Sequence, residues 1–188
     1  MRFISLMSLI MLLTFTSLEA REEFWYMGVG GGATFLEDAD DAFNEIDEKS
    51  FIAKAYTGYR ASNYVAFELE YAYLGEYDYR RLGIEDKADY SALSLEIVVM
   101  YPLVIDGLEL FTPVGGSAIL TDYGDNPELD NKIVFGYKLG FGAAYTPPSY
   151  KHFTMRLGVE VFSFEIESTL EDYRQNIASA YATVQYNF

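Results

Sequence analysis

Apolar and polar residues alternate along most of this chain, and the last twelve residues show the pattern most clearly. In the segment 177–188 (IASAYATVQYNF), every second residue counted back from Phe188 is apolar or aromatic, and the residues between them are mainly polar. A period of two predicts a β-strand, because successive side chains on a strand point to opposite faces. Twelve residues are about enough to cross a bilayer at a tilt. The pattern therefore predicts a sheet with one apolar and one polar face.

Seven other segments alternate in the same way, so the chain is expected to form eight strands. The expected strands are 24–35, 51–61, 64–75, 90–101, 108–120, 133–145, 153–164 and 177–188. In 108–120 the sequence leaves the parity of the strand, meaning which alternate residues face inward, undecided. Pro113, Gly115 and Gly116 interrupt the alternation there. The strand from 24 to 35 is expected to pair with the last strand and close a cylinder.

The connections between these strands alternate between short and long. Short turns are expected near 62–63, 102–107 and 146–152, and long acidic loops at about 36–50, 76–89, 121–132 and 165–174. The four long segments hold 20 acidic and six basic residues, which is 14 of the 16 excess negative charges of the chain. An even number of strands with all short turns at one rim predicts an all-β fold, an eight-stranded antiparallel up-and-down barrel that crosses a membrane.

Residues 1–20 (MRFISLMSLIMLLTFTSLEA) combine one basic residue, a short apolar run and small residues, which predicts a cleaved signal peptide. The alternative is an N-terminal anchor, but the apolar run is short. The mature barrel domain is then 21–188. The chain has no cysteine, so the fold needs no disulfide or thiolate metal site. A net charge of −16 argues against nucleic acid as a partner.

Charged residues inside the expected strands share one face. These are Lys54, Arg60, Glu68, Glu70, Glu96, Lys138, Arg156 and Glu160. In a soluble β-protein this face would meet water, whereas in a membrane barrel it would fill the lumen. Long apolar and aromatic residues occupy the other face, with tyrosines near strand ends, and this favours the membrane barrel.

An eight-stranded barrel is just wide enough for its own side chains to fill the interior. Four bases and four acids in that space are expected to pair with one another, since an unpaired buried charge is costly. The sequence therefore favours a plugged, structural lumen. A narrow or gated path for ions or small solutes stays open as an alternative.

Several stretches together resemble the transmembrane domain of the outer-membrane protein A superfamily, including small eight-stranded barrels like outer-membrane protein X. They are AYTGYRASNYVAFELEYAYLG (55–75), GYKLGFGAAYTP (136–147), MRLGVEV (155–161) and the final VQYNF. The resemblance implies an outer-membrane location in a Gram-negative-type bacterium, and places Glu68 and Arg156 in the family's lumen salt-bridge cluster. Because the sequence ends at Phe188, we expect it to lack the peptidoglycan-binding domain of longer members.

The resemblance also implies partners. Outer-membrane lipid and lipopolysaccharide would surround the barrel, and a surface ligand could bind the acidic loops. The outer-membrane assembly machinery would be a transient partner that reads the terminal strand, with Val184, Tyr186 and Phe188 as the assembly signal. We expect a monomer.

No motif for catalysis, cofactor binding or metal binding is recognisable. The only histidine, His152, lies in a short turn without a serine–histidine pattern, so a solvated turn residue is the better interpretation. We therefore expect a structural, non-enzymatic outer-membrane protein without a cofactor, whose acidic extracellular loops serve envelope integrity or surface interaction. The alternatives are a narrow channel and a lipid-modifying enzyme.

Overall fold

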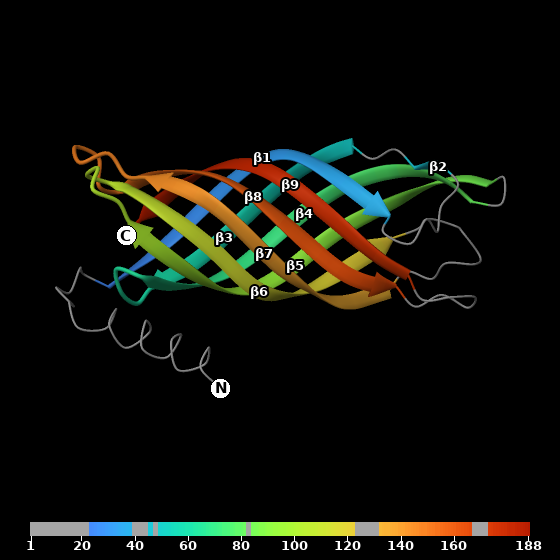
Figure 1. Cartoon of the computed structure of the whole chain (residues 1–188), viewed down its shortest axis with the longest axis horizontal. Helices are drawn as coiled ribbons and strands as arrows, with labels where there is room; N and C mark the ends of the chain where they lie inside the picture. Colours follow the sequence, from blue (N-terminus) through green and yellow to red (C-terminus); the bar gives the residue numbers. More distant parts are fainter. Residues whose placement is uncertain (1–22, 39–44, 47–48, 82–83, 123–131, 167–172) are drawn as a thin grey trace, which may run out of the picture.

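The computed structural model describes residues 23–38, 45–46, 49–81, 84–122, 132–166 and 173–188, which form β-strands and the short turns between them (Figure 1). The strands are β1 (Phe24–Asp38), β2 (Glu45–Ile46), β3 (Lys49–Arg60), β4 (Val65–Arg81), β5 (Ile84–Pro102), β6 (Leu108–Asp122), β7 (Lys132–Tyr145), β8 (Phe153–Ile166) and β9 (Tyr173–Asn187). The predicted signal peptide lies outside these residues. In the described ranges, no helix is long and apolar enough to cross a membrane.

Eight of these strands, all except the two-residue β2, close into one antiparallel barrel. Each barrel strand pairs with its neighbour in chain order, and β1 pairs with β9, so that Val29 lies opposite Val184. In Figure 1 the first strand, in blue, runs beside the last strand, in red, and both are tilted relative to the axis of the cylinder. Closure leaves no open sheet edge in the barrel wall, and a backbone surrounded by hydrocarbon requires this because lipid offers no hydrogen bonds. The predicted eight-stranded barrel is confirmed.

The barrel wall has an apolar outer face and a largely polar inner face. On the outside, large side chains such as Trp25, Leu95 and Phe141 keep about half or more of their surface exposed. The inner side chains from the opposite parity are buried, and many of them are charged. A soluble barrel would have the reverse arrangement, because burial of apolar surface drives folding in water. The exposed apolar wall fits a lipid environment.

The β4–β5 hairpin corrects one predicted loop. The segment 76–89 was expected to be a charged loop, but β4 and β5 pair through it as far as Arg81 and Ile84. The hairpin extends well beyond the barrel at the long-loop end (Figure 1). Where it leaves the barrel, one face buries Tyr77 opposite Ala88, while Glu76 and Asp78 on the other face are exposed. Lys87 forms ion pairs there with Glu76 and Asp78.

These ion pairs have an electrostatic consequence outside the membrane. The hydrogen bond to Glu76, together with the negative charges of Glu76 and Asp78, raises the pKa of Lys87. The other expected long loops begin later and end earlier than predicted. The preceding strands extend to Asp38, Asp122 and Ile166, and the following strands begin at Lys49, Lys132 and Tyr173. The rest of those loops lies outside the described residues, apart from β2, which pairs with β4.

The structure also decides the parity of β6. Phe111, Ser117 and Ile119 point inward, and Val114 and Leu120 point outward. The pairing of β6 with β7 passes from Phe111–Gly142 to Val114–Leu139 without pairs at 112 and 113. Pro113 has no backbone N–H to donate, so the ladder is interrupted there.

The half of the interior nearest the long loops is mainly apolar, although it also buries Thr34 and Gln175, and the sequence did not predict this apolar cluster. Its buried side chains include Leu36, Ile52, Leu74, Ile119, Phe162 and Ile177. We call this cluster the apolar plug. The register stacks its members across neighbouring strands, with Ile177 opposite both Leu36 and Phe162. The lumen therefore changes along its axis from polar at the short-turn end to apolar at the other.

Candidate functional site

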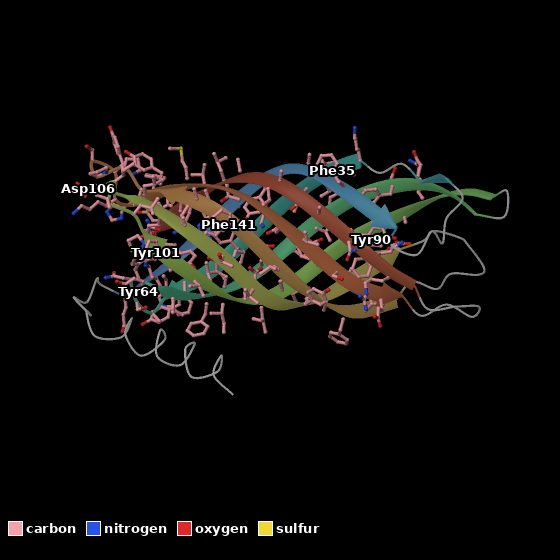
Figure 2. All side chains as sticks on the ribbon, in the orientation of Figure 1. Phe35, Tyr64, Tyr90, Tyr101, Asp106 and Phe141 are labelled. Atoms are coloured by element: carbon pink, nitrogen blue, oxygen red, sulfur yellow. The ribbon has the colours of Figure 1, made fainter. Side chains whose placement is uncertain are left out.

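All eight charged residues predicted to face the lumen lie inside the barrel, and each keeps 7% or less of its surface exposed. Figure 2 shows side chains on both sides of the wall, with Tyr64 and Tyr101 at the short-turn rim. The eight belong to β3, β4, β5, β7 and β8, and the closed cylinder directs them toward a common axis. The structure brings them together in three groups along that axis.

The central group contains three glutamates and two lysines. Lys54 Nζ lies 2.8 Å from Glu70 Oε2 and 2.7 Å from Glu160 Oε1. Lys138 Nζ lies 2.7 Å from Glu96 Oε1 and 3.1 Å from Glu160 Oε2, and it also contacts Glu70. Each lysine therefore serves more than one carboxylate. Such sharing compensates the loss of hydration that burial imposes on every one of these charges.

Arg156 and Glu68, the pair that the family resemblance singled out, form the second group. Arg156 Nη1 donates to Glu68 Oε1 at 2.7 Å, and the hydroxyl of Tyr26 donates to the same oxygen at 2.6 Å. Three rings surround the guanidinium, with its Cζ 4.9 Å from the centroid of Tyr56, 5.2 Å from Phe111 and 5.3 Å from Tyr26. Arginine stacks favourably on such aromatic faces. Glu68 thus neutralises the charge of Arg156, and the three rings hold its guanidinium group in place.

The third group, at the short-turn end, includes a residue that the sequence did not reveal. Arg60 forms two parallel bonds with Glu109, at 2.9 Å and 2.8 Å, and also donates to the backbone oxygens of Ser62 and Asn63. Glu109 lies on β6, whose parity the sequence left undecided. The inward parity of Phe111, two residues later, would have identified it.

With Glu109 included, the described part of the lumen buries five acids and four bases. The expectation of four matched pairs was therefore incomplete. β6 contributes Glu109 to the network, although none of the eight charged residues expected from the sequence lies on this strand.

Glycines make room for aromatic rings across neighbouring strands. Tyr26 lies opposite Gly58, and Tyr56 lies opposite Gly28. A Cβ atom on Gly58 would come within 2.5 Å of the Tyr26 ring, and one on Gly28 within 2.3 Å of the Tyr56 ring. Phe111 and Gly142 repeat the arrangement on β6 and β7. These rings lie across the adjacent strand because no side chain opposes them.

The network leaves little free space. A cavity of about 10 Å³ lies among Lys54, Glu70, Lys138 and Arg156, which is room for about one water molecule. Arg156 Nε has no protein hydrogen-bond partner among the described residues. A single water there could satisfy this nitrogen. Phe162 of the apolar plug lies two residues after Glu160 on β8, so the plug adjoins this packed network.

The only histidine of the chain lies at the short-turn rim. His152 is exposed, and its Nδ1 lies 3.0 Å from the backbone oxygen of Asn187, while its ring stacks on Tyr186. The described residues contain no group of three or more histidine, cysteine or acidic side chains that could hold a metal ion.

The three residues of the predicted assembly signal lie on the outer wall. Val184, Tyr186 and Phe188 are exposed, and the rings of Tyr186 and Phe188 contact each other at a centroid distance of 5.2 Å. The backbone N–H of Phe188 donates to Trp25 O at 2.9 Å, which ties the terminus to β1. Their role as an assembly signal stays a prediction.

A closed eight-stranded barrel with an apolar wall and a charged interior defines the chain as a transmembrane β-barrel of the bacterial outer membrane. The chain belongs to the OmpA-like transmembrane domain family, whose model matches residues 20–188. It lies in the outer membrane of a Gram-negative bacterium.

Two curated relatives are both outer membrane protein A. That of Escherichia coli O157:H7 is 28% identical over 124 residues, covering 61% of this chain and 35% of the relative, and that of Salmonella typhi is 28% identical over 110 residues, covering 56% and 31%. The chain thus aligns with about a third of the length of these relatives.

Solved structures show the same fold at low sequence identity. Neisserial surface protein A has a TM-score of 0.65 at 11% identity, covering 89% of this chain and 100% of that one. OprG from Pseudomonas aeruginosa has a TM-score of 0.62 at 10% identity, covering 92% and 99%. Ail, the attachment invasion locus protein of Yersinia pestis, has a TM-score of 0.55 at 10% identity, covering 89% and 100%.

Proposed function

We propose that this protein is a structural, non-enzymatic component of the outer membrane, with a plugged lumen and an acidic surface displayed outside the cell. The observation that carries the proposal is the closed lumen. Charged groups are shared across five strands in its central and Arg156 groups, and the apolar plug lies between them and the long-loop end. Such an interior stabilises a barrel from within, whereas a porin keeps its interior filled with water.

The β4–β5 hairpin supports the second part of the proposal, the interaction surface. It places Glu76 and Asp78 on a paired, extended arm beyond the barrel rim, where both side chains are exposed. A paired arm holds charges at fixed positions, so it can present them to a partner at lower entropic cost than a loose loop. We therefore place the partner-facing charge on this hairpin.

The envelope role predicts a permeability defect in cells that lack the protein. A deletion strain should take up a hydrophobic fluorescent dye faster than the parent strain, because the membrane loses a barrel with a packed interior. The wild-type chain should restore the barrier, and so should Glu76→Gln/Asp78→Asn, which alters only the hairpin charge. Unchanged dye uptake in the deletion strain would contradict the envelope role.

One observation favours a narrow channel as the alternative. A vestibule of about 630 Å³ opens at the short-turn rim and reaches Arg60, Glu109 and Arg156. An ion could enter this far from the periplasm before meeting the packed network.

Single-channel recording in planar bilayers separates the two functions. The plugged lumen predicts no resolved conductance steps for the wild-type protein, because the remaining cavity holds about one water molecule. Heat-unfolded protein and empty detergent provide the baseline. Well-defined steps that Glu68→Ala or Arg156→Ala abolishes would establish the channel and reject the plugged lumen.

A further inference from the structure

A groove crosses the lipid-facing wall from β1 to β6. It has a volume of about 740 Å³, and its walls include Trp25, Tyr59, Phe67, Leu95 and Val114. At Gly116 a Cβ atom would meet nothing within 4 Å, so the absent side chain leaves a gap on the outer surface between the side chains of Leu95 and Tyr137. Next to this gap, Leu95 keeps 69% of its surface exposed. We call this feature the wall groove.

The wall groove begins at the short-turn rim and climbs toward the middle of the barrel. Trp25, Tyr59, Phe67, Ile97 and Val114 lie opposite one another in successive strand pairs and form one continuous row. Trp25 is the second residue of β1, whereas Val114 is the seventh of β6. Because barrel strands tilt, such a row changes depth as it passes around the wall. Four strand spacings make it about 19 Å long. With strands tilted by about 40°, the row rises about 12 Å along the barrel axis, which is most of the roughly 15 Å of one leaflet of the hydrocarbon core.

The rim end of the wall groove carries a negative charge beside aromatic rings. The rings of Trp25 and Tyr59 contact each other at a centroid distance of 5.1 Å. The hydroxyl of Tyr59 donates to the carboxylate of Glu23, which is exposed. A carboxylate next to the faces of tryptophan and tyrosine attracts an ammonium group, through charge and through cation–π contact. It disfavours a head group whose only charge is a phosphate.

We propose that the wall groove binds a phospholipid with a primary ammonium head group, from the periplasmic leaflet of the outer membrane. The ammonium group lies against Glu23, Trp25 and Tyr59. One acyl chain follows the apolar row and reaches the gap at Gly116 near the middle of the bilayer. The short-turn rim faces the periplasm in outer-membrane barrels, which sets the leaflet.

Trp25 is the only tryptophan of the chain and reports on this site directly. The folded protein is reconstituted into vesicles of phosphatidylethanolamine and phosphatidylglycerol, with bromine on the acyl chains of one lipid at a time. Quenching of Trp25 by each brominated lipid gives their relative binding constant. We expect phosphatidylethanolamine to be preferred about threefold to fivefold.

Two variants and two matched controls test the two ends of the site. Glu23→Gln should remove the preference by deleting the charge, and Gly116→Leu should reduce it by filling the gap. Asp106→Asn deletes another acid at the same rim, and Ala180→Leu adds the same bulk to another lipid-facing position, so both should keep the preference. Equal quenching by the two lipids, or a preference that survives both Glu23→Gln and Gly116→Leu, would show ordinary lipid contact and overturn the proposal.

Discussion

Replacing Lys138 with methionine should lower the free energy of unfolding by about 3–5 kcal/mol, the cost of breaking a buried ion pair by removing one partner. Lys138 contacts Glu70, Glu96 and Glu160 and is 1% exposed. Without it, Glu70 and Glu160 keep their contacts with Lys54, whereas Glu96 loses the lysine that it pairs with. Urea unfolding in lipid vesicles, followed by the fluorescence of Trp25, measures the change.

The exposed pair Arg174–Glu165 provides the matched control. Its side chains keep 53% and 64% of their surface exposed, so Arg174→Met should change stability by less than about 1 kcal/mol. A double-mutant cycle adds Glu96→Gln, which removes one of the unpaired charges. The double variant should be more stable than the sum of its single changes indicates. Equal small losses for Lys138→Met and Arg174→Met would show that the buried network does not stabilise the barrel.

Replacing Gly58 with leucine should destabilise the barrel by about 3 kcal/mol, the upper part of the range for overpacking. The new side chain would collide with the ring of Tyr26. That ring cannot move aside freely, because its hydroxyl donates to Glu68 and its face contacts Arg156. The fraction of folded protein on unheated gels and the urea midpoint both measure the loss.

Two further variants isolate the steric cause. Gly116→Ala places a methyl group in open space and should leave stability within about 0.5 kcal/mol. Gly58→Leu combined with Tyr26→Ala should recover part of the loss, since the smaller residue makes room for the leucine. If Gly58→Leu alone folds as well as the wild-type protein, the packing of Tyr26 against β3 does not constrain the fold.

The sequence was most informative where the two faces of a strand differ in chemistry. The segment 64–75 alternates large apolar residues with glutamates, and the structure points Phe67 outward and Glu68 inward as expected. It was least informative where that contrast fails. The segment 76–89 carries eight charged residues and reads as a loop, yet it is a paired hairpin. In β6, Pro113 and two glycines blur the parity, and Glu109 stayed hidden for that reason.

The apolar plug shows a further limit. Ile52, Leu74 and Ile177 are apolar residues on the inner parity near strand ends, so the alternation alone assigns them to a polar lumen. They lie at a common depth in the barrel because of the stagger between neighbouring strands. That stagger cannot be read from the sequence of any single strand. Only the closed barrel shows that they stack into one cluster.

In every barrel strand except β6, the sequence by itself determined which residues face lipid and which face the lumen, because the strand period of two fixes a face without any knowledge of neighbours. Only the tertiary structure decided which acid meets which base. Lys54 and Glu160 are 106 residues apart and meet at 2.7 Å because the barrel closes with one particular stagger. That stagger depends on the pairing of all eight strands at once, so the ion-pair network and the wall groove belong to the closed cylinder.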